Sequence, residues 1–491
     1  MSGIYDLPPF RPAEGEFDPA WASLNSYECP EWYRDAKFGI WSHWDPQSVP
    51  ERGDWYARNM YLQGSRQYNH HVKTYGHPSE FGYKDLCRLW TCQKWQPERL
   101  MDLYVRAGAR YFVSLANHHD NFDCWNSRYQ PWNAVNIGPK RDVVGTWARL
   151  ARERGLRFGV TVHTTPGRTW SQFMPRYHAC DTEGPKKGVP YDGRLTREDG
   201  KGQWWEGLDP QMLYGPPHTA QDLPDPGFVR QFLWRVDDLI RQYDVDLLYF
   251  DDALMWLVDV GVYLGMPDLA PQIAAHYYNL SIQKHGRNEA VLNIKDVYPR
   301  FAKAVVRDFE MKRCEALEPY PWQTDTSTGE WHYNVEQKYR TATNILHEIA
   351  DVVSKNGNVL INVPLHADGS VDPEPERCLN DIGDWMRLNG EAIYGTRPWH
   401  VHGQQSVRFT TKGETLYAIL LDWPQDGSAA IGALGRGEWG GSIREVSLLG
   451  CGPVAFERDA ARLLVTLPRK QPCDHAWVLK LEGRWLTQVM P

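Results

Sequence analysis

Two acidic residues follow a short apolar segment near the middle of the chain. Residues 247–250 read Leu-Leu-Tyr-Phe, and Asp251 and Asp252 come directly after them. A short apolar run between polar boundaries is typical of a buried strand in a parallel sheet. Side chains alternate along a strand, so Asp251 should share a side with Tyr249, and Asp252 should face the other way. We therefore expect Asp251 to have a chemical role. The alternative is that both aspartates only cap the following helix or form salt bridges in a loop.

Polar side chains also end most of the other strands that the sequence predicts. In a (β/α)8 barrel, the carboxyl ends of the strands carry the catalytic residues, because the βα loops open to solvent there. These polar ends would therefore meet at one face of a barrel. They are His43 after residues 37–42, His118 and His119 after 111–116, His163 at the end of 157–163, Lys295 at the end of 290–295 and Glu310 at the end of 304–310.

One aspartate and one glutamate among histidines and aromatic rings are the groups that glycoside hydrolysis needs. One carboxylate attacks the anomeric carbon, while the other protonates the leaving oxygen and later deprotonates water. The chain has 23 tryptophans and 25 tyrosines, and aromatic faces stack on sugars as well as filling cores. Retention or inversion depends on the distance between the two carboxyl groups, which the spacing in the sequence does not give.

The adjacent histidines His118 and His119 give little support for a metal site. Neighbouring residues on an extended strand face opposite ways, and no further Cys, His or Glu set completes a coordination sphere. Hydrogen bonding to hydroxyl groups suits neutral imidazole, which offers one donor and one acceptor. A pair of locally satisfied loop histidines is the alternative. We expect no metal and no other cofactor.

The predicted elements alternate between strands and helices up to about residue 397. Residues 97–107, 142–154, 228–242, 271–284, 344–354 and 377–388 have helical spacing, and 358–362 is a further strand. This alternation favours a TIM-like (β/α)8 barrel, with a long functional insertion at 166–226. After Pro398, short alternating runs with Gly and Asp turns predict a β-sandwich. We place the barrel at residues 1–397 and the C-terminal β-sandwich at 398–491.

The net charge and the cysteines restrict the binding partners and the cellular compartment that we expect. The net charge is −8 and no Lys/Arg block occurs, which argues against a nucleic-acid or anionic-membrane partner. The nine cysteines are scattered and form no CxxC motif, so we expect reduced thiols. The first residues lack a signal-peptide pattern, and no stretch is long enough to span a bilayer. We expect a cytoplasmic protein.

From Trp32 to Trp399 the sequence resembles the α-L-fucosidases of glycoside hydrolase family 29. Each matching block is short, but so many blocks in the same order are not expected by chance. The blocks are RDAKFGIWSHW (34–44), GDWYARNM (53–60), AGARYFV (107–113), NHHD (117–120), NIGPKRD (136–142), YFD (249–251), PWQTDT (321–326), DVVSKNG (351–357) and NGEAIYGT (389–396).

The resemblance implies a retaining exo-α-L-fucosidase acting on glycans or glycosides with terminal α-L-fucose, on a distorted (β/α)8-like barrel with a C-terminal β-sandwich and no metal. The family's nucleophile falls on Asp251. The general acid/base varies in position across the family; we assign it to Glu310, with Glu315 and Glu330 as rivals. The substrate-binding residues that the resemblance implies are His43, Asp54, Trp55, His118, His119, Tyr249, Lys295 and Trp331.

Among these, Trp331 resembles the aromatic residue that packs on the methyl group of fucose, and an apolar wall there favours a 6-deoxy sugar. Three positions depart from the family pattern: Asp45 and Asp252 stand where glycine is usual, and Lys295 where we expect an arginine. An added acid could shift a catalytic pKa or change the sugar accepted. Alternative functions are the same mechanism on a related sugar such as α-L-galactose, or a non-catalytic carbohydrate-binding relative.

Overall fold

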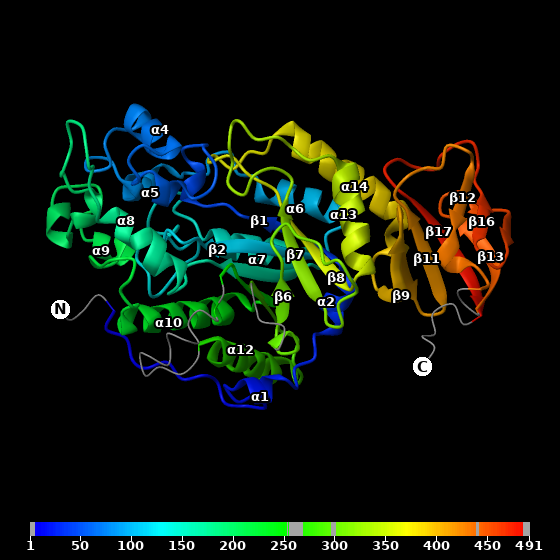
Figure 1. Cartoon of the computed structure of the whole chain (residues 1–491). Coiled ribbons are helices and arrows are strands. Elements are labelled where there is room, and N and C mark those ends of the chain that lie inside the picture. Colours follow the sequence, from blue (N-terminus) through cyan, green and yellow to red (C-terminus); the bar gives the residue numbers. More distant parts are fainter. Residues whose placement is uncertain (1–4, 253, 255–268, 296–300, 438–440, 485–491) are drawn as a thin grey trace.

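The structure is a computed structural model that describes residues 5–252, 254, 269–295, 301–437 and 441–484. Eight parallel strands form a closed barrel in sequence order, in which the last strand pairs with the first (Figure 1). The strands are β1 (Phe38–Ser42), β2 (Tyr111–Asn117), β3 (Arg157–Val162), β4 (Leu247–Phe250), β5 (Val291–Lys295), β6 (Val306–Asp308), β7 (Trp322–Ser327) and β8 (Gly357–Asn362).

Long helices, most of them amphipathic, cover the outside of the barrel. In α7, the N-cap Asp142 accepts a hydrogen bond from the Gly145 amide at 2.7 Å, and the apolar face with Trp147 is buried. No helix in the described part of the chain is long and apolar enough to cross a membrane. The long helices are α6 (Pro97–Arg106), α7 (Val143–Glu153), α10 (Pro226–Tyr243), α12 (Leu269–His285), α13 (Ala342–Ser354) and α14 (Pro373–Asn389).

Shorter helices precede β1 and lie in the loops that follow β1 and β3. Figure 1 shows α4, α5, α8 and α9 gathered at the end of the molecule that lies away from the C-terminal sheets. The shorter helices are α1 (Trp21–Leu24), α2 (Glu31–Ala36), α3 (Tyr56–Asn59), α4 (Arg66–Thr74), α5 (Tyr83–Leu89), α8 (Met174–Tyr177) and α9 (Pro210–Tyr214).

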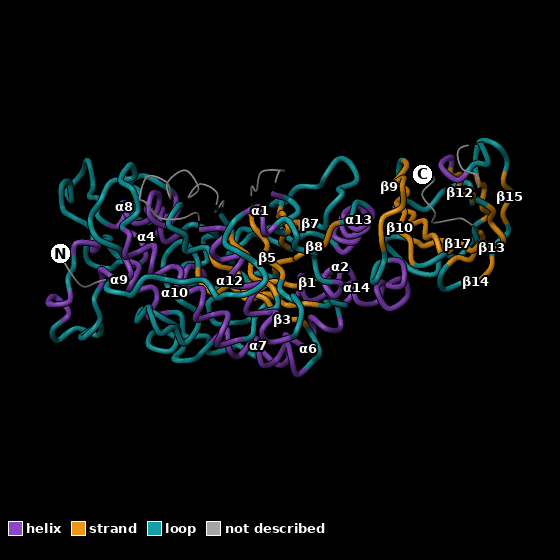
Figure 2. Tube along the Cα trace, turned by 90° about the horizontal axis from the view of Figure 1, so that it is seen from below, coloured by secondary structure: helices purple, strands orange, loops and turns teal. Residues whose placement is uncertain are grey.

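Two antiparallel sheets follow the barrel and pack around their own apolar core, and they form a group separate from the barrel strands (Figure 2). The Trp385 indole of α14 donates to the Ala476 carbonyl at 2.8 Å, which joins the two parts. The larger sheet has the order β14 (Gly452–Pro453), β13 (Ser442–Leu448), β17 (Trp477–Arg484), β11 (Thr415–Leu420), β10 (Val407–Lys412) and β9 (Arg397–Gln404); the smaller has β12 (Ser428–Ile431), β16 (Leu463–Thr466) and β15 (Phe456–Arg458).

The predicted fold class, a (β/α)8-like barrel followed by a β-sandwich, is confirmed. Strand β7 was absent from the predicted strands, because its sequence Trp-Gln-Thr-Asp-Thr-Ser has no apolar run, although every residue is buried. Strand β6 is shorter than predicted and ends at Asp308, so Glu310 lies in the loop after it. The insertion at 166–226 contains α8, α9 and several tight turns.

The interior of the barrel is filled by side chains, as in other barrels of this kind. Tyr33, Tyr111 and Tyr249 lie in one buried cluster with branched residues of the strands. The Tyr111 ring lies directly over Gly39 of β1, where a Cβ atom would overlap it. Glycine at this position therefore lets a large ring fill the lower part of the barrel, below the polar strand ends.

Candidate active site

Asp251 lies at the end of β4 on the same side as Tyr249, facing the interior of the barrel. The Tyr249 hydroxyl is 3.5 Å from Asp251 Oδ1 and 3.0 Å from both Asp308 Oδ1 and Asp325 Oδ2. Burial, and then the Asp325 carboxylate, raise the pKa of Asp308 well above its usual range. A protonated Asp308 can donate to Tyr249, which in turn donates to Asp325. The Tyr249 hydroxyl, next to Asp251 at the end of β4, is thus held by a chain of hydrogen bonds.

Lys295, at the end of β5, is surrounded by carboxylates. Its ammonium group contacts Asp251, and it lies 3.0 Å from Glu310 Oε2 and 3.4 Å from Asp325 Oδ2. Burial disfavours the charged amine, but Asp251 and then Asp325 hold the pKa of Lys295 well above its usual range. Burial likewise disfavours the charged form of Asp251, but Lys295 holds the pKa of Asp251 well below the ordinary value. Asp251 is therefore an ionised carboxylate, the form that a nucleophile needs.

Two histidines approach the other oxygen of Asp251. His163 Nδ1 lies 3.0 Å and His119 Nε2 3.8 Å from Asp251 Oδ2. Burial lowers the pKa of His119 well below its usual range, so this ring is neutral. Because a neutral imidazole can donate through one nitrogen, the His119 ring can face the carboxylate without removing its charge.

Glu310 projects from the loop after β6, and 44% of its side chain is exposed. Its Oε1 accepts a hydrogen bond from the Trp331 indole at 3.1 Å, while Oε2 faces Lys295. Asp251 and Glu310 thus contact one ammonium group. The rivals lie differently: Glu315 is exposed, and Glu330 binds Asn334 Nδ2 at 3.0 Å through both oxygens. In the described residues neither rival has a contact with Lys295 or Asp251.

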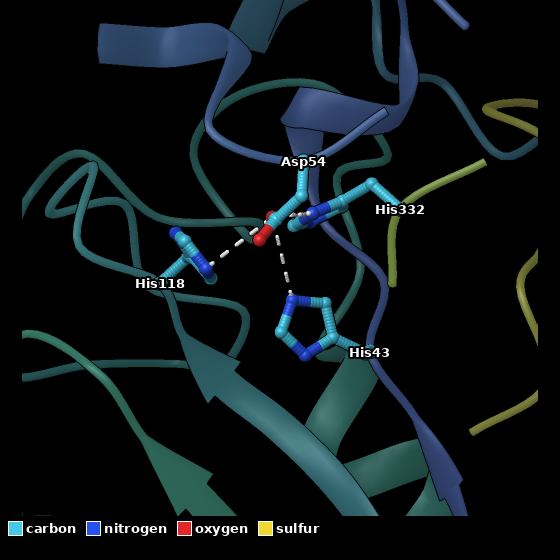
Figure 3. Close-up of side chains that lie close together, drawn as sticks. All are labelled: His43, Asp54, His118 and His332. Atoms are coloured by element: carbon cyan, nitrogen blue, oxygen red, sulfur yellow. Dashed lines mark hydrogen bonds and ion pairs between the residues drawn. The ribbon is translucent and has the colours of Figure 1, made fainter. Parts of the chain in front are cut away.

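Asp54 lies at the centre of a group of histidines from three loops (Figure 3). Its Oδ1 is 2.6 Å from His332 Nδ1, 3.6 Å from His118 Nε2 and 3.8 Å from His43 Nε2. Burial disfavours the charged carboxyl, but His118, with His332 and His43, holds the pKa of Asp54 well below its usual range. Burial lowers the pKa of His43 to about 4, so that ring is neutral at physiological pH.

The hydrogen positions in this group suit hydroxyl binding better than metal binding. The Ala57 amide donates to Gln47 Oε1 at 3.1 Å, so the Gln47 amide nitrogen faces His118 Nδ1, 2.8 Å away. His118 Nδ1 must then accept, and the hydrogen sits on Nε2, toward Asp54. His332 has a carboxylate at each ring nitrogen and carries two hydrogens. These rings are therefore donors, although their spacing would allow an ion.

Aromatic rings form the walls of the site. The Trp331 ring centroid lies 5.4 Å from that of Trp41 and 5.9 Å from that of His43. The Trp55 and Phe173 ring centroids lie 5.1 Å apart, and that of Phe173 is 5.3 Å from that of His119. Phe173 belongs to the insertion after β3, which therefore reaches the site, as a long functional loop would. Sequence reasoning did not name Phe173, because one phenylalanine in a long irregular segment carries no signal by itself.

The two added acidic residues have partners away from the centre of the site. Asp45 is fully buried, accepts from the Gln47 amide at 2.7 Å and lies 2.9 Å from His332 Nε2. Asp252 contacts the Thr165 hydroxyl and accepts from the Arg168 amide at 3.2 Å, so it braces the loop after β3. Sequence reasoning missed His332 and Asp325, since both lie in polar segments whose position in the fold was not predicted.

Comparisons with known proteins agree with this fold. A family model described as alpha-L-fucosidase matches residues 10–391, and one for the alpha-L-fucosidase C-terminal domain matches 402–482. Tissue alpha-L-fucosidase of Rattus norvegicus is 27% identical, with 96% of this chain and 93% of that protein covered. The human tissue enzyme is 26% identical, with 95% and 92% covered.

Solved structures give the same result. Thermotoga maritima alpha-fucosidase, crystallised in complex with fucose, matches with a TM-score of 0.72 and 26% identity, covering 95% of this chain and all of that one. A trapped covalent intermediate of a Bacteroides thetaiotaomicron GH29 alpha-L-fucosidase, 17% identical with a TM-score of 0.65, covers 96% of this chain and 98% of that one and has the same fold. The family model spans well over half of the sequence, and the chain therefore belongs to the α-L-fucosidase family of glycoside hydrolases.

Proposed function

We propose that this protein is a retaining exo-α-L-fucosidase that removes terminal α-L-fucosyl residues from glycans or glycosides by double displacement. One observation carries the proposal: Asp251 and Glu310 share the Lys295 ammonium group at the carboxyl ends of the barrel strands. A nucleophile must be ionised and close to its acid partner, and this lysine supports both conditions.

In the first step, an Asp251 oxygen forms a bond to the anomeric carbon while the bond to the leaving oxygen breaks. Glu310 gives its proton to that oxygen, so the aglycone leaves as a neutral alcohol. Lys295 contacts Asp251 and Glu310, and its positive charge balances the negative charge that passes between them. The product of this step is a fucosyl ester of Asp251.

In the second step, water attacks the anomeric carbon and the ester bond to Asp251 breaks. Glu310, now a carboxylate, takes the proton from the water and returns to its starting form. Two inversions at one carbon give net retention of configuration. The exposure of Glu310, at 44% of its side chain, suits a group that must reach first an aglycone and then water.

The sugar would lie between the histidine group around Asp54 and the ring of Trp331. Among the described residues, neither ring nitrogen of His43 or His119 has a hydrogen-bond partner, although both rings are buried. Buried polar atoms without partners are costly, so a ligand with hydroxyl groups is the natural partner here. The Trp331 face offers an apolar surface for the C6 methyl group.

The test is hydrolysis of 4-nitrophenyl α-L-fucoside, with proton NMR to identify the first anomer released. We expect D251A to lower kcat by about a thousandfold or more. E310A should lose about a hundredfold or more on substrates with poor leaving groups, and azide should restore its rate on the nitrophenyl substrate. Matched variants D252N, E315Q and E330Q should keep near-normal rates. Release of β-L-fucose first, or an E310A enzyme with unchanged kinetics, would contradict the assignment.

A further inference from the structure

Asp45 and His332 form a buried ion pair directly behind Asp54. His332 and Asp45 are fully buried, whereas 23% of the Asp54 side chain is exposed to the site. The His332 ring lies between the two carboxylates, 2.9 Å from Asp45 and 2.6 Å from Asp54. The three groups therefore form a line of contacts from Asp45 through His332 to Asp54, and of the three only Asp54 is exposed. Figure 3 shows the contact between His332 and Asp54.

The charges along this line are defined by their neighbours. Burial disfavours protonation of the His332 ring, but Asp45 and Asp54 raise the pKa of His332 to about 10. Asp120 lies beside Asp45 and accepts a hydrogen bond from the Tyr83 hydroxyl at 2.6 Å. Burial and the Asp45 charge raise the pKa of Asp120 well above its usual range. The groups along this line therefore have a defined order of charge: Asp120 is neutral, Asp45 is ionised, His332 is positively charged and Asp54 is ionised.

The backbone around His332 is tied to the loop that carries Asp54. The Gly53 amide donates to the Tyr333 carbonyl at 3.1 Å, and the Val335 amide donates to the Glu51 carbonyl at 3.2 Å. These bonds join the loop after β1 to the loop after β7. The His332 ring thus starts from a fixed backbone position, and it needs only Asp45 to fix its rotation.

The three rings around Asp54 all approach the same oxygen. His332, His118 and His43 face Oδ1, and within the described part of the chain Oδ2 has no hydrogen-bond partner. A carboxylate held in this way presents one oxygen, in one orientation, to the site. A hydroxyl group that donates to Oδ2 would then be held at a defined position beside the His43 and His118 rings.

On the basis of the proposed function, we propose that Asp45 and His332 are positioning residues that fix Asp54 as the acceptor for one hydroxyl group of the sugar. In this way the pair determines which hydroxyl pattern the site accepts. Neither residue needs to touch the sugar. A buried ion pair contributes little net stability by itself, because desolvation offsets the attraction, so its value here lies in orientation.

The experiment is a double-mutant cycle on kcat/KM. The variants are H332Q, D54N and H332Q/D54N, measured with 4-nitrophenyl α-L-fucoside and with analogues that each lack one hydroxyl group. We expect H332Q to lower kcat/KM by about tenfold to a hundredfold, the range for a lost hydrogen bond to a charged group. Because His332 acts through Asp54, the double variant should be no slower than D54N.

Selectivity is the readout that a purely structural role would not change. The wild type should prefer the parent sugar strongly over one of the analogues, and this preference should collapse in both H332Q and D54N. D45N keeps a hydrogen bond to His332 without the charge, so its loss should be smaller. Additive losses in the double variant, or a selectivity that H332Q leaves intact, would overturn the proposal.

The matched control is H276Q on α12. His276 is also buried, and its Nε2 lies 2.8 Å from Asp237, but this pair lies on outer helices of the barrel. H276Q should lower the melting temperature without changing selectivity. If the wild type hydrolyses no α-L-fucoside, the proposed function fails; binding of L-fucose by calorimetry, compared between wild type and H332Q, then still tests the positioning role. Saturable Zn²⁺ binding that H332Q abolishes would overturn the hydrogen placement.

Discussion

The indole N–H of Trp331 donates to Oε1 of Glu310 across 3.1 Å. The same ring packs against Trp41, which lies inside the barrel. A residue whose face can hold the sugar therefore also holds the carboxyl group that we assign as acid and base. This link joins the loop after β6 to the loop after β7 and makes the position of Glu310 depend on the aromatic wall.

Trp331 can be tested by removing only its N–H group. W331F keeps an aromatic face but leaves Oε1 of Glu310 without its donor. We expect kcat to fall by about tenfold, the effect of one hydrogen bond to a charged group, with a smaller change in KM. The control is W204F, which loses a 2.8 Å hydrogen bond to Asp85. A W331F enzyme with unchanged kcat would show that this bond does not position Glu310.

The Lys295 ammonium group is shared by three carboxyl groups of the site. K295M would leave Asp251, Glu310 and Asp325 without the cation that they share. Unpaired buried charges cost about 3–5 kcal/mol of unfolding free energy, and kcat should fall by about a hundredfold or more. K295R retains the charge and should recover part of both losses. Denaturant unfolding and steady-state kinetics give the two values, and equal behaviour of K295M and K295R would contradict a charge effect.

His163 contacts Oδ2 of Asp251, the proposed nucleophile, whereas Lys295 contacts Oδ1. H163F keeps a buried ring but removes the nitrogen that lies 3.0 Å from Asp251 Oδ2. We expect kcat to fall by about tenfold to a hundredfold with a small change in KM, because the carboxylate loses one orienting group. Pre-steady-state release of 4-nitrophenol separates the two steps. A normal rate of the first step in H163F would exclude this role.

The stability that His43 and His71 contribute should fall as the pH decreases from about 6.5 to 4. Burial lowers the pKa of His43 and of His71 to about 4, whereas in the unfolded chain a histidine has a pKa near 6.5. The unfolded chain therefore binds more protons in this range, so each group contributes stability above pH 6.5 that is lost toward pH 4. The loss per histidine is on the order of 3 kcal/mol. Urea unfolding at several pH values measures it, and H71Q should reduce the slope by one proton.

Gly39 should be intolerant of any side chain. A Cβ atom there would overlap the Tyr111 ring inside the barrel, so G39A should cost about 1–3 kcal/mol of unfolding free energy. Shortening the opposing ring should relieve the overlap, and G39A/Y111L should therefore lose less than the sum of the two single variants. Strictly additive losses would show that the two residues do not compete for the same space.

Local patterns in the sequence were sufficient for most of the fold. The apolar run of β4 predicted the strand, and alternation along it placed Asp251 beside Tyr249. Helix α7 begins one residue after the predicted start and ends one residue before the predicted end. Such patterns are visible because neighbouring residues share one environment. Strand β7 was missed, since its buried side chains are polar and find their partners on other strands.

Only the tertiary structure decided which polar groups meet. Lys295 and Glu310 lie 15 residues apart, and nothing in their spacing requires one ammonium group to contact both Glu310 and Asp251. His332 reaches Asp54 across 278 residues, through loops that follow the first and seventh strands. The sequence by itself determined the barrel and the sandwich, and it predicted the kinds of catalytic group. Closure of the barrel determined their arrangement, because it brings distant strand ends to one face.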